Sequence, residues 1–172
     1  MNWVAFISQT GREVYNIYKQ TGIKPLFVVT NNINRVIQEV KDEFDIKIIP
    51  NRPSVEDYLK LEIPQNSIVT LNGWLRIVPK EIVNKYTIYN GHPGLINRYP
   101  ELKGLDPQIR AIKGDYEYIG CVIHKVDELL DNGEILCSIQ TKVNKFWNED
   151  DYFNKFSQMM LDLWIGFFKD FN

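Results

Sequence analysis

Residues 4–30 read VAFISQTGREVYNIYKQTGIKPLFVVT, which is an apolar run, an amphipathic run and a second apolar run. The first run, 4–8, predicts a strand that ends in a polar turn. From Val14 onward, three apolar residues follow the i, i+3, i+4 spacing of one helical face, and Gly22 is typical of a helix end. The β-branched run 25–30 predicts a second strand. The order strand, helix, strand indicates two parallel strands joined by a crossover helix.

The same alternation continues through the first half of the chain. A helical apolar stripe begins at Ile33 and ends at Phe44, and Ser54 is a typical N-cap for a short helix that reaches Leu59. Further strands are predicted over three apolar runs, 46–49, 68–71 and 86–89. Nearly continuous apolar strands separated by amphipathic helices are typical of a mostly parallel sheet with helices on both faces, so the predicted fold class is α/β.

The second half of the chain changes character. Residues 119–126 and 134–142 predict two strands that form an antiparallel pair or add at the sheet edge. A long terminal helix is predicted from Glu149 to Lys169. It carries an aromatic-rich stripe made of Phe153, Phe156, Met160, Leu163, Trp164, Phe167 and Phe168. This stripe favours packing against the sheet, and the alternative is an oligomer contact, which would give a homodimer.

Length and composition restrict the class of protein. The chain has 172 residues and a mass of 20.2 kDa, so we expect one domain over residues 1–172. Lys and Arg number 20 against 22 Asp and Glu, and the net charge of −2 argues against sequence-independent nucleic-acid binding. The sequence contains no apolar run of about 18 residues, so no membrane-spanning helix is predicted. The N-terminus lacks the basic start of a secretory signal. The expectation is a cytoplasmic protein with two reduced thiols, Cys121 and Cys137.

Metal and nucleotide fingerprints are not found in the sequence. His92 and His124 are the two histidines, and together with the two cysteines their spacing fits no zinc pattern. The glycine-rich signatures of dinucleotide-binding and P-loop proteins are missing, as is the GxSxG elbow. We therefore expect no metal site.

Polar residues that can carry chemistry gather near predicted strand ends. Asn72-Gly73 and Asn90-Gly91 predict turns at the C-terminal ends of two strands, where open α/β sheets bind ligands. The second turn lies in residues 89–100, YNGHPGLINRYP, and adds a histidine, His92. Downstream, the loop 127–133, DELLDNG, holds carboxylates that would raise the pKa of a nearby histidine. Taken singly, each segment is also typical of an ordinary solvated loop.

Together these segments resemble the folate-dependent formyltransferases, in particular the glycinamide ribonucleotide transformylase type and its catalytic-domain relatives. The resemblance begins at residues 6–11, FISQTG, and continues through 71–79, LNGWLRIVP. It includes Asn90-Gly91-His92-Pro93, the loop 127–133 and the terminal helix. It implies a Rossmann-like fold, a single formyltransferase catalytic domain over residues 1–172, and 10-formyltetrahydrofolate as the formyl donor.

The resemblance also implies that Asn90, His92 and Asp131 are catalytic. In this chemistry an amine attacks the formyl carbon, and Asn90 and His92 would donate to the tetrahedral oxyanion that forms. Asp131 would orient His92 and an ordered water that relays the amine proton.

Binding residues follow from the same resemblance. The folate donor would lie between two groups of residues, Leu75, Arg76, Ile77 and Val78 on one side and Asp127 and Leu130 on the other. The acceptor would meet Gly11, Arg12, Pro93, Gly94, Arg98 and Lys103. One departure is Glu13, which stands where relatives that bind a phosphorylated ribonucleotide carry a neutral side chain, and a carboxylate repels phosphate.

We therefore expect an enzyme that transfers a formyl group to a primary amine of a small molecule. A phosphorylated sugar-type acceptor is favoured, either glycinamide ribonucleotide or an amino-sugar nucleotide. Initiator transfer RNA is disfavoured because the acidic chain has no basic extension. Two alternatives stay open, a hydrolase that uses water as the acceptor and a non-catalytic folate-binding remnant.

Overall fold

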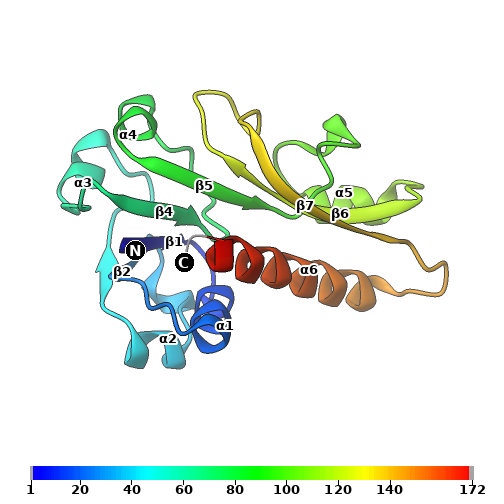
Figure 1. The fold of residues 1–172 in the computed structure, drawn as a ribbon, viewed down its shortest axis with the longest axis horizontal. Helices are drawn as coiled ribbons and strands as arrows, with labels where there is room; N and C mark the ends of the chain where they lie inside the picture. Colours follow the sequence, from blue (N-terminus) through cyan, green and yellow to red (C-terminus); the bar gives the residue numbers. More distant parts are fainter. Residues whose placement is uncertain (1, 171–172) are drawn as a thin grey trace.

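The computed structural model describes residues 2–170, in which seven strands form one mixed sheet in the order β3-β2-β1-β4-β5-β6-β7 (Figure 1). The parallel part consists of β1 (Asn2–Ile7), β2 (Phe27–Thr30), β3 (Ile46–Ile48), β4 (Ser67–Leu71) and β5 (Thr87–His92). The antiparallel part consists of β6 (Tyr118–Lys125), which pairs with β5, and β7 (Ile135–Lys142), which pairs with β6 at the sheet edge. The predicted α/β class, with a mostly parallel sheet and an antiparallel C-terminal element, is confirmed.

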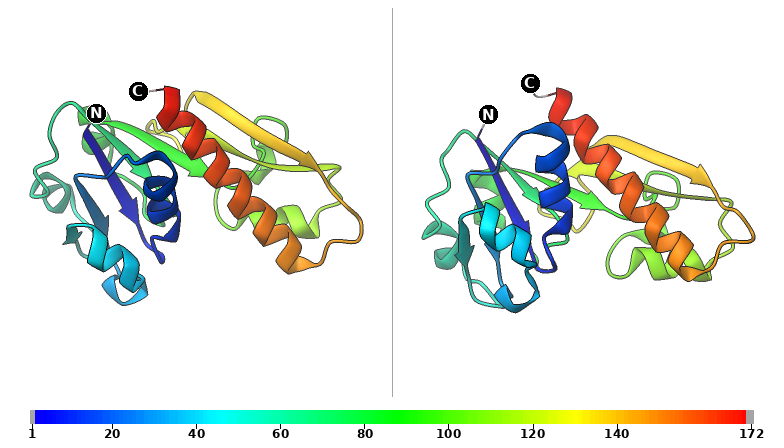
Figure 2. Two further views of the ribbon diagram at one scale, coloured as in Figure 1. Left: turned by 60° about the horizontal axis from the view of Figure 1, so that its bottom comes forward. Right: turned by 90° about the horizontal axis from the view of Figure 1, so that it is seen from below.

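Helices cover both faces of the sheet. The helices are α1 (Arg12–Thr21), α2 (Gln38–Glu43), α3 (Val55–Leu59), α4 (Lys80–Lys85), α5 (Pro107–Lys113) and α6 (Glu149–Asp170), with short 3-10 turns at Ile33–Arg35 and Pro100–Leu102. One core contains buried residues of α1, α2, α5 and α6, and the other contains those of α3 and α4. Figure 2 shows α6 running across one face of the sheet with α1 beside it.

The aromatic stripe of α6 is used inside the chain. Its members are buried except for Phe153, which is partly exposed. The Phe168 ring lies 4.5 Å from the Trp3 ring, and the Phe167 ring lies 4.9 Å from the Tyr89 ring. The preferred interpretation, a helix packed on the sheet, is confirmed, so this stripe is not the free surface that an oligomer contact would need.

Two local signals behave as predicted. Gly22 ends α1 in the left-handed conformation, with φ +73°, and its N–H donates to Tyr18 O. Ser54 caps α3 through a capping box with Asp57, in which each side chain accepts a hydrogen bond from the other residue's backbone N–H. Gly73 also has a positive φ of +71°, as the turn after β4 requires.

The single helix predicted between Ile33 and Phe44 is wrong. The chain forms a 3-10 turn, breaks at Val36 and Ile37, and only then starts α2. Ile37 is extended, with ψ 157°, because its N–H donates to Thr10 O in the loop after β1. The helices α4 and α5 were not predicted, since helices of six and seven residues are too short to display a periodic stripe.

The turn predicted at Asn90-Gly91 is also wrong, because these residues belong to strand β5. They pair with β6, with Asn90 opposite His124 and Gly91 opposite Ile123. A Cβ at Gly91 would lie 2.8 Å from Trp164 Nε1, so the glycine here allows close packing of the strand on α6 rather than a turn.

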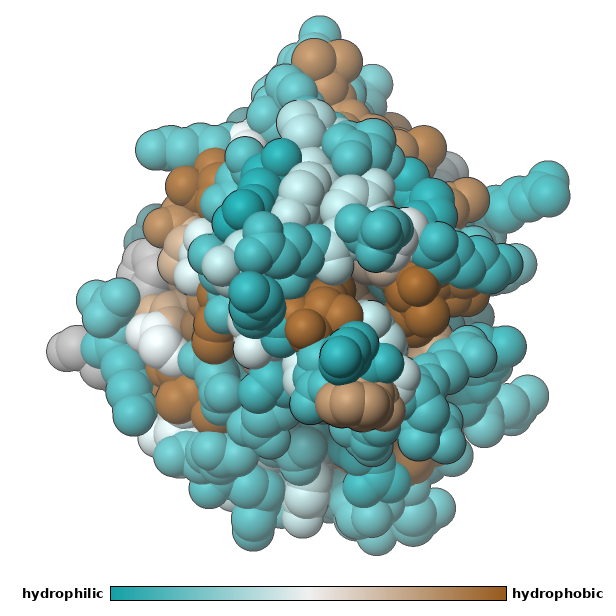
Figure 3. All heavy atoms as spheres, turned by 90° about the vertical axis from the view of Figure 1, so that its right-hand side faces the viewer, coloured by the Kyte–Doolittle hydropathy of each residue, from teal (hydrophilic) through white to brown (hydrophobic). Residues whose placement is uncertain are grey.

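Other surfaces add few constraints. None of the helices in residues 2–170 is long and apolar enough to cross a membrane. Cys121 is buried, Cys137 is partly buried, and both thiols are free. The end of the molecule that lies at the right in Figure 1 is mostly hydrophilic, with hydrophobic side chains in small separate groups (Figure 3).

Candidate active site

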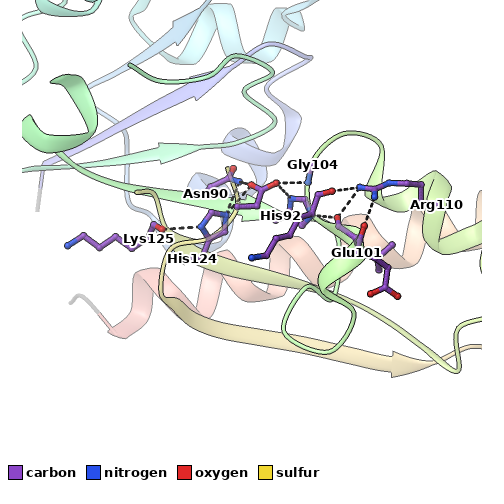
Figure 4. Close-up of polar contacts among 10 residues, drawn as sticks. Asn90, His92, Glu101, Gly104, Arg110, His124 and Lys125 are labelled. Carbon is purple, nitrogen blue, oxygen red and sulfur yellow. Dashed lines mark hydrogen bonds and ion pairs between the residues drawn. The ribbon is translucent and has the colours of Figure 1, made fainter. Parts of the chain in front are cut away.

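The last residues of β5 direct two polar side chains to the same side of the sheet. Alternate residues of a strand share a face, so Asn90 and His92 face together while Gly91 faces α6. His124 lies opposite Asn90 on β6, and Figure 4 shows the three side chains clustered. His92 and His124 are almost fully buried, at 4% and 2% exposure.

Asp131 joins this cluster from the loop between β6 and β7. Its Oδ1 lies 3.3 Å from Asn90 Nδ2 and 3.4 Å from His124 Nε2. Its Oδ2 lies 3.4 Å from His92 Nδ1 and accepts a hydrogen bond of 2.9 Å from the Gly104 N–H. Asp131 adopts the left-handed conformation, with φ +48°, which aspartate tolerates better than most residues. The three residues predicted to be catalytic therefore lie in contact.

Backbone carbonyls determine which atoms of the cluster carry protons. His124 Nδ1 lies 3.1 Å from Lys125 O, and a carbonyl can only accept, so Nδ1 carries the proton. In the neutral ring Nε2 is then an acceptor, and it lies 3.1 Å from Asn90 Nδ2. The Asn90 amide consequently points its NH2 group into the cluster, toward His124 and Asp131.

His92 is held at both ring nitrogens. Its Nε2 lies 2.9 Å from Leu102 O, so Nε2 carries a proton and donates to that carbonyl. A Cβ at Gly94 would lie 2.9 Å from the same nitrogen, which shows how closely the backbone packs on the ring. Burial lowers the pKa of His92, and the negative charge of Asp131 offsets part of that effect.

Asp131 is kept ionised by its neighbours. Burial by itself would raise the pKa of this carboxyl, but the His124 and His92 rings, which donate to it when they are protonated, and the Gly104 N–H together hold it below its usual range. An ionised carboxylate beside two imidazoles can take part in passing a proton between groups of the site. The cluster thus combines N–H donors with an ionised acceptor.

The residues predicted to bind the donor lie on two loops, one that follows β4, whose Leu71 pairs with Asn90, and one between β6 and β7 that also carries Asp131. Leu75 and Ile77 are exposed, at 49% and 81%, while Val78 is partly buried against the core under α4. The loop is fixed by Ser8, whose Oγ accepts from the Leu75 N–H at 3.0 Å, and by Arg76, whose Nε donates to Asn51 O at 2.6 Å.

The opposite loop presents a second apolar surface. Leu130 is 63% exposed, and Asp127 stabilises the turn by accepting from the Leu129 N–H at 2.9 Å. An ion pair of 2.9 Å between Lys80 and Glu128 ties this loop to α4. Exposed apolar side chains on two fixed loops suit a flat ligand with an aromatic ring system.

The residues predicted to bind the acceptor are dispersed. Pro93 and Gly94 follow β5 directly, and Lys103 donates to Asn132 Oδ1 at 2.8 Å beside Asp131. Arg98 instead lies over the Tyr118 ring at 4.3 Å, at the opposite end of β6 from His124.

Gly11 and Arg12 begin α1, on the other face of the sheet. Gly11 is buried with φ +77°, and a Cβ there would lie 2.9 Å from Ile7 Cδ1, so both the conformation and the space favour glycine, while Arg12 is exposed. These two residues are not brought into contact with the cluster around Asp131.

Glu13 lies in the first turn of α1 and reaches Asn72, the residue after β4. Its Oε1 accepts from Asn72 Nδ2 at 2.8 Å, and Asn72 is oriented by Thr70, whose hydroxyl donates to Asn72 Oδ1 at 2.6 Å. Burial raises the pKa of Glu13, although its hydrogen bond with Asn72 opposes this. The Trp164 N–H makes no hydrogen bond with any of residues 2–170.

Three partners of the cluster were not predicted from the sequence. Two of them, Leu102 O and Gly104 N–H, are backbone groups, which no side-chain pattern reveals. His124 was considered as one of the two histidines in the argument against a zinc site, and the signal that could have found it is its position on a strand paired with the end of β5. Among residues 2–170 no group of His, Cys, Asp and Glu is arranged to hold a metal ion.

Comparisons with known proteins identify the family of the chain. A family model described as formyl transferase matches residues 1–162. Phosphoribosylglycinamide formyltransferase of Bacillus subtilis is 24% identical over 106 residues, which are 59% of this chain and 53% of that protein. Methionyl-tRNA formyltransferase of Bacillus cytotoxicus is 30% identical over 105 residues, which are 60% of this chain and 32% of that protein.

The fold is shared with solved structures over nearly the whole chain. The crystal structure of phosphoribosylglycinamide formyltransferase from Streptococcus pneumoniae aligns with a TM-score of 0.86 at 20% identity, and it covers 99% of this chain and 98% of that one. The chain spans about half or less of the length of the curated relatives that it matches.

Proposed function

The chain belongs to the formyl transferase family, and on that premise we propose that its β5–β6 cluster transfers a formyl group from 10-formyltetrahydrofolate to a primary amine. The observation that carries the proposal is the convergence of Asn90, His92 and Asp131 from two distant segments into one buried cluster. Residues 1–172 would then act as one catalytic domain.

Formyl transfer requires attack by the amine, stabilisation of the oxyanion and breakdown of the intermediate, and these residues can support each of these. The amine nitrogen attacks the formyl carbon and a C–N bond forms, which moves negative charge onto the formyl oxygen. Asn90 Nδ2–H and a ring N–H of His92 would donate to that oxygen in a site from which water is largely excluded. Collapse of the intermediate breaks the bond between the formyl carbon and N10 of the folate, and N10 takes up a proton.

The proton lost by the amine needs an acceptor. Asp131 is ionised and lies 3.4 Å from His92 Nδ1, so we assign it the role of orienting His92 and receiving this proton through a water. Both donors are engaged within the cluster, so the formyl oxygen must replace Leu102 O or Asp131 as the partner of at least one of them.

The donor's ring system would lie between the two loops described above. Leu75, Ile77 and Leu130 expose apolar surface there, and the loop backbones supply hydrogen-bonding groups. Their fit to a folate rests on this combination of apolar side chains and fixed backbone.

For the acceptor we propose a small amine rather than a transfer RNA, because the chain carries a net charge of −2. A phosphorylated sugar-type amine, either glycinamide ribonucleotide or an amino-sugar nucleotide, is the favoured class. Lys103, which lies beside Asp131 through its hydrogen bond to Asn132, is the cation assigned to it.

The test measures formyl transfer from 10-formyltetrahydrofolate to a panel of phosphorylated amines, with formate release measured in parallel. Asn90→Ala and His92→Ala should each lower kcat by about 10²–10³-fold, the usual loss when one oxyanion donor is removed. Near wild-type transfer by both variants would refute the assignment. Rapid formate release without any amine would favour the hydrolase alternative instead.

A further inference from the structure

We infer that Arg110 is a positioning residue for His92 and Asp131, acting through the backbone of residues 101–104, an inference that rests on the proposed function for its catalytic consequence. Arg110 lies on α5 and does not touch the cluster itself. Figure 4 shows its guanidinium reaching the chain segment that does.

The guanidinium donates to three successive carbonyls. Arg110 Nη1 donates to Glu101 O at 2.5 Å, and Nη2 donates to Leu102 O at 3.1 Å and to Lys103 O at 2.6 Å. A planar fork of donors can hold several acceptors in a fixed arrangement, which a lysine ammonium on a flexible stem cannot do as well. Arg110 therefore determines the path of this segment.

The same segment is the scaffold of the cluster. Leu102 O accepts from His92 Nε2–H at 2.9 Å, and the Gly104 N–H donates to Asp131 Oδ2 at 2.9 Å. Lys103 Nζ donates to Asn132 Oδ1, which ties the segment to the residue after Asp131. Each of the two proposed catalytic groups is thus held by a backbone group of residues 101–104.

A chemical consequence follows for His92. A carbonyl held at Nε2 makes Nε2 the protonated nitrogen of the neutral ring, and it fixes the orientation of the ring beside Asp131. Without Arg110, Leu102 O would lose its fixed position, and the proton would distribute between Nε2 and Nδ1 because Asp131 Oδ2, 3.4 Å from Nδ1, also favours a proton there. The proposed catalytic residues would all be present, but the His92 ring would no longer have one defined tautomer.

The chain offers a direct readout because His92 and His124 are its two histidines. With nitrogen-15 histidine, the neutral rings are observed by NMR at pH about 8.5, above the ordinary histidine pKa of about 6.5. His92 should show Nε2–H, and His124, whose Nδ1–H donates to Lys125 O, should show the opposite tautomer. His124 is an internal control because Arg110 does not contact its carbonyl partner.

In Arg110→Met, His92 should become a mixture of tautomers while His124 stays unchanged. The kcat of formyl transfer should fall about 10- to 100-fold, the usual cost of removing a group that orients a site residue, with KM for the donor little changed. Lys113→Met, which removes an exposed cation from the same helix, is the matched control and should leave both signatures and kcat as in the wild type.

A wild-type His92 signature in Arg110→Met would overturn the inference. If that variant does not fold, Arg110→Lys is read in the same way, and a wild-type signature together with wild-type kcat would show that the fork is not needed. The tautomer is read without substrate, so the two proposals are tested separately. If Arg110→Met changes the His92 signature and the wild-type protein transfers no formyl group, the proposed function is refuted and the positioning role stands.

Discussion

Gly91→Ala tests whether packing on the far face of the sheet sets the geometry of the candidate site. The new Cβ would lie 2.8 Å from Met160 Sδ and from Trp164 Nε1, and 3.0 Å from Trp164 Cζ2, whereas ordinary contacts begin at 3.4 Å. The methionine can move aside because its side chain is flexible. Trp164 cannot, because it is fully buried and packs against the rings of Phe167 and Phe168.

The strand must therefore move away from α6. Overpacking of this kind costs about 1–3 kcal/mol, partly offset by the entropy that alanine removes from the unfolded chain. A net loss of about 1–2 kcal/mol corresponds to a fall in Tm of about 2–8 °C for a chain of this size. Asn90 and His92 flank the displaced residue, and a misplacement approaching 1 Å can lower kcat by about 10²-fold.

The assay combines thermal unfolding with formyl-transfer kinetics. Gly166→Ala is the matched control because nothing lies within 4 Å of its added Cβ, and alanine in a helix interior should stabilise by about 0.5–1 kcal/mol without changing kcat. Trp164→Phe removes the two indole atoms that the Cβ would strike, so the double variant should be more stable than the sum of the single effects by at least about 0.5 kcal/mol. Additive effects, or a Gly91→Ala protein with wild-type Tm and kcat, would refute the reasoning.

Two further predictions concern buried polar groups. The pKa of Glu13 is raised by burial, so its favourable contribution is complete below the unfolded value of about 4.5 and is lost as pH rises through the folded pKa. Glu13→Gln should therefore gain stability relative to the wild type as pH rises through that window, by about 1.4 kcal/mol for each unit of the shift. Denaturant unfolding from pH 4 to pH 8 measures this, and a difference that is flat with pH would contradict it. His124→Phe removes the acceptor of one Asn90 N–H and should lower kcat about tenfold or more with little change in KM for the donor, whereas equal kcat in steady-state assays would show that His124 does not orient the amide.

The strands could be predicted because short, nearly continuous apolar runs in the sequence indicate buried strands. The run at Phe27–Thr30 is buried at every position, and such a run has few alternatives to a central parallel strand. The two short helices α4 and α5 could not be predicted, since their formation depends on packing and on loop contacts such as those of Arg110 rather than on periodicity.

The candidate site, like the fold, could be predicted only in part from the sequence. Asn90, His92 and Asp131 were found by resemblance of their segments to a family, and the structure brings them into contact, while their catalytic roles stay predictions. Leu102 O and Gly104 N–H could not be found because a backbone group acquires a role only from the path of the chain. The turn predicted at Asn90-Gly91 does not form, because pairing with β6 overrides the strong local turn preference of this dipeptide.

Gly91, for which a turn was predicted, explains how the end of β5 contributes to both faces of the sheet. Asn90 and His92 can share the site face only if the residue between them faces α6, and that face is filled by Trp164. A side chain at residue 91 would separate β5 from α6, whereas a turn there would stop the two polar residues from facing together. Glycine in a strand interior is otherwise unfavourable, so its presence here follows from the close approach of β5 to Trp164. The geometry of the candidate site is therefore set partly by the core beneath it, and substitutions in α6 that touch no substrate should alter kcat through Gly91.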